Sequence, residues 1–247
     1  MAERETTKTV RARIGYLSPS LPSASHVKKL QLFIPKDVEI IFEQLTLHDG
    51  RLSDVQGKLD MIVGKAVELT DKHHWDGLIF PGAPREVLNP GLYARFSSSL
   101  TIPVATALRS SVAAMQAFSV KRVLLMTPFE ESLNKLIREF LADAGIEAVS
   151  PAKTLQHYTD ALKLTSDDVE SLTKKALAQH ERVEAVYFQG AVLDPIEILQ
   201  KMEGELEIPV LASNPAMLWF MLSKLGVRYE IAGYGKLLSS WPALPLG

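Results

Sequence analysis

Cysteine is absent from this 247-residue chain. Its absence excludes disulfide bonds, thiolate metal sites and every mechanism in which a cysteine attacks a substrate or moves a proton. An excess of positive charge is also missing, because 27 Lys and Arg residues stand against 29 Asp and Glu residues, for a net charge of −2. A chain without basic excess is poorly suited to neutralise phosphates, so we expect no nucleic-acid partner.

Long apolar runs are absent as well. The apolar stretch at 216–222 falls far short of the roughly 20 residues that a membrane helix needs. The N-terminal segment MAERETTKTVRAR is charged and lacks the apolar core of a signal peptide. We therefore expect a cytoplasmic protein with no membrane partner.

The residues that are present predict an α/β fold. Apolar residues make up 47% of the chain and charged residues 23%, which is typical of a globular protein. Short β-type runs end in turn signals and alternate with helical patterns, which favours parallel sheets covered by helices. The expected strands are 14–17, 38–42, 77–80, 123–126, 183–188 and 209–211. The expected helices are 53–72, 108–118, 130–144, 166–180, 195–205 and 215–224.

The sequence also repeats itself once. RIGYLSP at 13–19 resembles RVLLMTP at 122–128, and WDGLIFPG at 75–82 resembles VEAVYFQG at 183–190. LTIPVA at 100–105 resembles LEIPVL at 206–211, and all three pairs keep the same order at offsets of about 106–109 residues. We therefore predict two similar α/β lobes from an internal duplication, each a parallel sheet flanked by helices. The first lobe is expected at 10–118 with the C-terminal segment 227–247, and the second at 119–226.

A duplicated frame predicts where a ligand binds. In open α/β sheets ligands bind beyond the carboxyl ends of the strands, so the loops after matched strands should face each other across a cleft between the lobes. These loops are rich in small and hydroxyl residues and in backbone N–H groups, which suits a small carboxylate. The expected ligand-binding residues are Ser18, Pro19, Gly82, Ala83, Thr127, Phe129, Gly190, Ala191, Ser213 and Asn214.

Motifs for cofactors are not found. No GxGxxG fingerprint, Walker A pattern or HExxH spacing occurs, so we expect no cofactor and no metal. The apolar runs at 112–118 and 217–225 are typical of core helices. They also offer a surface for a lobe–lobe contact or a homo-oligomer.

Several of these stretches together resemble the aspartate/glutamate racemase superfamily, in the branch of arylmalonate decarboxylase and maleate cis-trans isomerase. The resemblance runs from about residue 14 to 238. It is carried by IGYLSP (14–19), the Gly82 loop, KRVLLMTPF (121–129), LNKLIREFL (133–141), IPVLASNPAMLW (208–219) and GYGKL (233–237). These motifs imply the two-lobed fold and the branch, and they do not specify one reaction.

The resemblance implies that the two cysteine positions of this superfamily fall on Gly82 and Gly190. In the superfamily these cysteines face each other and move protons or attack the substrate, and the decarboxylase branch keeps only the second. The family's carboxylate pocket falls on Ala83 and Pro84, and a carboxylate-holding tyrosine falls on Phe129, so its hydroxyls are missing here. Pro84 also has no N–H to donate.

The remaining acid–base candidates lie in the stretch that resembles the wall of the second lobe's pocket. Tyr158 and His157 are the expected proton donors. A phenol can protonate a carbanion, and so can an imidazole, whose ordinary pKa lies near physiological pH. A small-carboxylate enzyme of the decarboxylase/lyase or isomerase type, independent of cysteine, is the first expectation. The alternative is a binding protein that kept the cleft and lost the activity.

Overall fold

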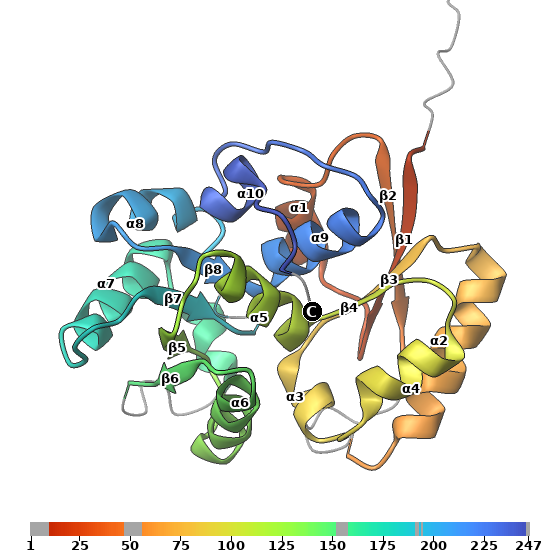
Figure 1. Ribbon diagram of the computed structural model, residues 1–247, viewed down its shortest axis with the longest axis horizontal. Helices are drawn as coiled ribbons and strands as arrows, with labels where there is room; N and C mark the ends of the chain where they lie inside the picture. The colour runs from red at the N-terminus through yellow and green to blue at the C-terminus, as the bar shows by residue number, and fades with distance from the viewer. Residues whose placement is uncertain (1–9, 47–55, 152–157, 191–192, 194, 246–247) are drawn as a thin grey trace, which may run out of the picture.

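The computed structural model describes residues 10–46, 56–151, 158–190, 193 and 195–245. Two four-stranded parallel sheets form its frame, with strand orders β2-β1-β3-β4 and β6-β5-β7-β8. Figure 1 shows the first sheet on the right and the second on the left, with helices on both faces of each. The predicted fold class is therefore confirmed.

The elements of the first half alternate as expected of βαβ units. Its strands are β1 (Ala12–Ser18), β2 (Val38–Gln44), β3 (Gly77–Phe80) and β4 (Val104–Thr106). Its helices are α1 (Ala24–Gln31), α2 (Leu59–His73), α3 (Ala83–Val87), α4 (Leu92–Ser99) and α5 (Ala107–Ala117).

The second half repeats this plan and adds a C-terminal helix. Its strands are β5 (Arg122–Met126), β6 (Glu147–Val149), β7 (Ala185–Phe188) and β8 (Val210–Ala212). Its helices are α6 (Glu131–Asp143), the short 3₁₀ helix η2 (Tyr158–Lys163), α7 (Ser166–Leu177), α8 (Leu199–Leu206), α9 (Ser213–Lys224) and α10 (Lys236–Ser240). Within the described residues, none of these helices is long and apolar enough to cross a membrane.

The three repeated sequence pairs occupy matching places in the two sheets. β1 pairs in parallel with β2 and β3, and β3 pairs with β4. In the second sheet β5 pairs with β6 and β7, and β7 pairs with β8. The repeats at 13–19 and 122–128 thus become β1 and β5, and the later repeats lead into β3 and β7 and into β4 and β8.

Helices α5 and α9 hold the two halves together. Although α9 follows β8, it contacts β3 and β4 of the first sheet as well as β8, and α5 contacts both β4 and β8. The two helices also contact each other, and Figure 1 shows them in the middle of the molecule. One buried apolar cluster therefore runs from Ile14 of β1 to Trp219 of α9. The lobe boundaries 10–118 and 119–226 stay a prediction, since this packing joins the halves.

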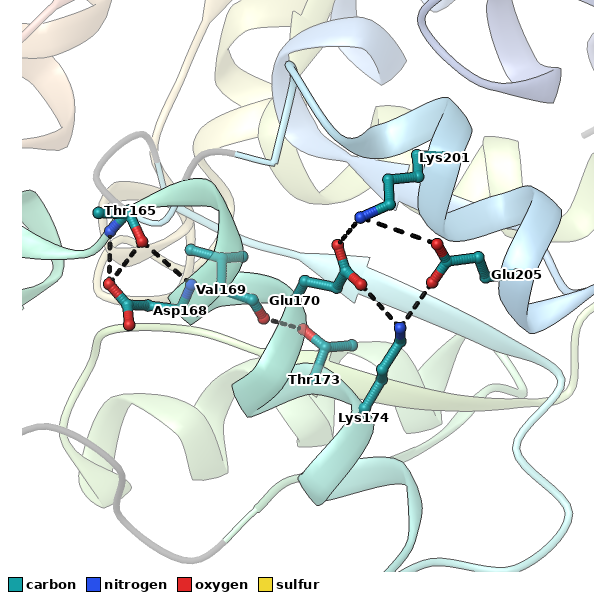
Figure 2. A network of polar contacts seen from close by, with 8 residues as sticks. All are labelled: Thr165, Asp168, Val169, Glu170, Thr173, Lys174, Lys201 and Glu205. Atoms are coloured by element: carbon teal, nitrogen blue, oxygen red, sulfur yellow. Dashed lines mark hydrogen bonds and ion pairs between the residues drawn. The ribbon is translucent and has the colours of Figure 1, made fainter.

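Within the second half, a polar network fixes α7 to α8 (Figure 2). Thr165 caps α7 and forms a capping box with Asp168. The Glu170 carboxylate accepts hydrogen bonds from Lys174 of the same helix and from Lys201 of α8, each at 2.7 Å. These two lysines lower the pKa of Glu170 to about 2.

Glu170 should make the stability of the protein acid-sensitive. Because its pKa is lower in the folded state, its contribution is complete above the ordinary glutamate pKa of 4.5 and is lost as the pH falls toward about 2. Glu170→Gln should therefore lower the melting temperature near neutral pH and flatten its fall between about pH 5 and pH 2. Thermal unfolding followed by circular dichroism across this range measures both effects.

A matched control is Glu139→Gln, because Glu139 pairs with Lys135 at 3.8 Å on the exposed surface of α6. This variant should keep the acid profile of the parent chain. An unchanged profile for Glu170→Gln would show that the α7–α8 network does not stabilise the fold.

Candidate functional site

The two halves meet at the carboxyl ends of their strands. The Tyr16 hydroxyl, near the end of β1, donates a hydrogen bond to Asn214 Oδ1 at 3.2 Å, in the first turn of α9. The neighbouring Ser213 Oγ lies 3.1 Å from the carbonyl oxygen of Phe188 and 2.9 Å from Gln189 Oε1. Residues that follow β7 and β8 are thus brought against the end of β1.

Gln189 directly precedes Gly190, the second expected cysteine position, and is fully buried. Its Oε1 also accepts a hydrogen bond from the Tyr187 hydroxyl. Among the described residues its Nε2 has no hydrogen-bond partner. Burial raises the pKa of Tyr187, and the Glu86 carboxylate across the junction adds to this effect. Tyr187 therefore stays a neutral hydrogen-bond donor at physiological pH.

The first of the two expected cysteine positions, Gly82, lies between β3 and α3. Its φ of 91° is a backbone conformation that favours glycine. A Cβ atom placed there would lie 2.6 Å from Arg85 Nη2 and 3.2 Å from Arg85 Nε. The guanidinium of Arg85 therefore occupies the space that a side chain at Gly82 would need.

The second position, Gly190, lies in an apolar setting. Its φ is 114°, and a Cβ atom there would lie 3.1 Å from Pro128 Cδ and 3.3 Å from Phe129 Cζ. The structure thus brings together Phe129 and Gly190, which the sequence analysis had placed in one site. Thr127 supports this turn, because its Oγ1 accepts a hydrogen bond from the Phe129 N–H at 3.2 Å and donates to Asn134 Oδ1.

Arg85 and Glu86 are consecutive charged residues of α3, and both are buried. Arg85 is 5% exposed and Glu86 is 7% exposed. Glu86 forms an ion pair with Arg109, with 3.3 Å between Oε1 and Nε. Burial raises the pKa of Glu86, while Thr106 and Arg109 oppose the rise.

Arg85 has no such carboxylate partner in the described part of the chain. Its guanidinium carbon lies 4.7 Å from the centre of the Phe80 ring, and its Nη1 makes no hydrogen bond. Burial lowers the pKa of Arg85 to about 9, and the nearby Tyr16 phenol opposes part of this fall. The guanidinium therefore remains charged at neutral pH.

The other expected site residues lie at the same strand ends or outside the described residues. Ser18 ends β1 and donates a hydrogen bond to the carbonyl oxygen of Ser20 at 2.6 Å. Pro19 is half-buried, and Ala83 is fully buried as the first residue of α3. Tyr158 begins η2, but the placement of its side chain is not described. His157 and Ala191 lie outside the described residues.

The loops expected after β3 and β8 lie at 81–85 and 213–215, and both contain helical residues. The first segment enters α3 at Ala83, and the second lies entirely within α9. The reason is proline in the first helical turn, where the missing N–H of Pro84 or Pro215 leaves no hydrogen bond unmade. The expectation that these residues form loops was therefore wrong, although both segments still follow their strands directly.

Two further residues of the site were not singled out by the sequence analysis. Tyr16 lies two residues before Ser18, and residues two apart in a strand share a face, so its position could have been inferred from Ser18. The only sequence signal for Gln189 is that it is a polar residue directly after an apolar strand. As for metals, the described residues contain no group of three or more His, Asp or Glu side chains that could hold an ion.

Known structures share this fold over nearly the whole chain. A sulfate-associated arylmalonate decarboxylase with one glycine replaced by cysteine has a TM-score of 0.78 and 18% identity, covering 92% of this chain and 99% of its own. A variant of the maleate isomerase from Pseudomonas putida S16, solved with maleate, has a TM-score of 0.75 and 17% identity, covering 92% and 97%. At such identities the comparison shows the fold alone.

Sequence comparison adds the family. The maleate isomerase of Alcaligenes faecalis is 26% identical over 144 residues, which are 58% of this chain and 56% of that protein. The match thus spans about half the length of this curated relative. The arylmalonate decarboxylase family model matches residues 85–238, which is more than half of the chain. The resemblance inferred from the sequence motifs is confirmed, and this chain belongs to the arylmalonate decarboxylase family.

Proposed function

We propose that the protein is an enzyme that removes CO₂ from a small carboxylic acid without a cysteine. The observation that supports this proposal is that glycine occupies both expected cysteine positions, while the chain keeps the fold of arylmalonate decarboxylase over nearly its whole length. The reaction must therefore be one that this frame supports without a thiol.

Two other reactions fit these residues less well. Racemisation needs two acid–base groups on opposite faces of one carbon, and neither Gly82 nor Gly190 carries a side chain. Addition of a thiol to a double bond is the second reaction. A maleate isomerase variant from Nocardia farcinica has been solved with a covalently bound succinylcysteine intermediate. No residue of this chain can form that intermediate, because the chain has no cysteine.

Decarboxylation requires less of the protein. The bond between the α carbon and one carboxylate breaks, CO₂ leaves, and the electron pair stays on the α carbon, delocalised into the remaining acid group. Hydrogen-bond donors or a cation aimed at that group stabilise the negative charge. One proton must then reach the α carbon, and we propose Tyr158, His157 or a water molecule as its source.

The proposal is tested by incubating the protein in D₂O with a panel of methylmalonate, phenylmalonate, maleate and aspartate, followed by NMR. A malonate should lose CO₂ and gain one deuterium at the α carbon, whereas maleate and aspartate should remain unchanged. Tyr158→Phe should lower kcat by about 10²- to 10⁴-fold if Tyr158 donates the proton.

Tyr234→Phe is the matched control, because it removes the same hydroxyl from a ring that packs on Phe33, in the C-terminal segment. Its turnover should equal that of the parent chain. If the malonates bind and are recovered unchanged, the protein is a carboxylate-binding protein and the proposed reaction is wrong.

A further inference from the structure

Arg85 is a buried cation that has no counter-ion among the residues that the structure describes. Arg85 is only 5% exposed, and its guanidinium forms no ion pair in the described part of the chain. An unpaired buried charge costs free energy, and arginines buried for structural reasons are normally paired with a carboxylate. Arg85 therefore lacks the partner that a purely structural arginine would have.

Its sequence neighbour Glu86 does not supply that partner. The Glu86 carboxylate pairs with Arg109 at 3.3 Å and interacts with Thr106 and Leu108 at the start of α5. Of these two adjacent buried charges, the carboxylate is paired with a cation, whereas the guanidinium is paired with no anion in the described ranges.

The guanidinium lies where the family chemistry would take place. Its Nη2 is 2.6 Å from the Cβ position of Gly82, the first of the two expected cysteine positions. The face of Phe80 supports it at 4.7 Å, a contact that orients a guanidinium without neutralising it. Tyr16, which interacts electrostatically with Arg85, reaches across to Asn214 of the other half.

We propose that Arg85 binds the carboxylate that the substrate retains. This inference rests on the proposed decarboxylation. A guanidinium can hold a carboxylate with two parallel N–H···O bonds, and Arg85 still has an Nη1 without a partner. It would compensate for the hydroxyls that are missing at Ala83, Pro84 and Phe129. After CO₂ leaves, the same cation would stabilise the negative charge that develops on the retained group.

The test is isothermal titration of methylmalonate and phenylmalonate into the full chain and into Arg85→Met, Arg85→Lys and Arg95→Met, with NMR of each mixture for consumption of the diacid. Arg85→Met should raise Kd by about 10- to 100-fold, as expected for losing charge-assisted hydrogen bonds. Arg85→Lys should give a smaller rise, since lysine keeps the charge and loses the two-pronged geometry.

Arg95→Met controls for net charge, because Arg95 is half-exposed and pairs with Asp60 at 2.7 Å on the surface of the same half. Its Kd should match that of the parent chain. Equal Kd values for the parent and Arg85→Met, or no binding of either diacid to the parent, would overturn the role of Arg85. Binding that depends on Arg85 without loss of CO₂ would support that role and overturn the proposed reaction instead.

Discussion

Replacing Trp219 with alanine is expected to lower the free energy of unfolding by about 3–5 kcal/mol, the usual cost of truncating a fully buried tryptophan. Trp219 lies on α9, has no solvent exposure, and donates a hydrogen bond from Nε1 to the carbonyl oxygen of Pro242 at 3.0 Å. The substitution leaves a cavity in the cluster shared by both halves and removes the donor for that carbonyl group.

Chemical denaturation by urea, followed by circular dichroism, measures this loss. Trp219→Phe keeps most of the ring volume and should cost clearly less, although it also removes the hydrogen bond to Pro242. A loss below about 1 kcal/mol for Trp219→Ala would mean that the neighbours collapse into the cavity and that α9 is not a rigid link. Because α9 begins with Ser213 and Asn214, its packing also fixes one wall of the site.

The fold was predictable where the sequence pattern is long or repeated. The helix expected at 130–144 spans Glu131–Asp143, and the strand expected at 123–126 is β5, Arg122–Met126. The short strands β4 and β6 were missed, since three residues are too few to show a period. The equally short β8 was predicted at 209–211 from the turn signals that follow it. The places of β4 and β6 are set by pairing with β3 and β5, which is tertiary information.

The sequence also could not show that α5 and α9 each contact strands of both sheets. The apolar runs in α5 and α9 show that both helices are buried, but a helix that is apolar on most sides does not indicate which sheet it covers. The structure shows that α9 lies on β3, where Gly77 leaves room for Met221. A Cβ atom at Gly77 would lie only 2.3 Å from Met221 Sδ.

For the site, the sequence located the strand ends, and it offered Arg85 and Arg109 as residues able to pair with a carboxylate without showing that Arg85 is buried. Gly82, Phe129, Gly190, Ser213 and Asn214 follow strands, which their turn signals and the repeat indicate. The burial of Arg85 depends on how α3 packs against α5 and α6, and no local pattern reports that contact. The roles of Tyr158 and His157 stay predictions, which the Tyr158→Phe experiment tests.

Arg85→Met is expected to raise the free energy of unfolding of the free protein by about 1–4 kcal/mol, because replacing a buried charge with an apolar side chain of similar length removes its desolvation cost. Because no described residue supplies a carboxylate to Arg85, we expect a larger gain than for a paired arginine. Denaturation by urea at pH 7 measures it. Arg95→Met, on the surface, should change the same free energy by less than about 0.5 kcal/mol.

The pH dependence of this gain follows from the shifted pKa. Burial lowers the pKa of Arg85 from 12.5 to about 9, so the folded protein bears the full cost of the charge below about pH 9. As the pH rises through 9, the folded state can lose the proton more easily than the unfolded state, and the parent chain regains stability. The difference between Arg85→Met and the parent should therefore be constant from pH 6 to about pH 8 and shrink above about pH 9.

A loss of stability in Arg85→Met would contradict this account and would show that the guanidinium holds α3 in place through contacts with Phe80 and Tyr16. Functional sites commonly carry residues that reduce stability, since a group prepared for a ligand is unsatisfied without one. A variant that is more stable and binds methylmalonate more weakly is the outcome expected if the Arg85 charge serves a ligand. The same variant with both properties reduced would assign Arg85 to the fold.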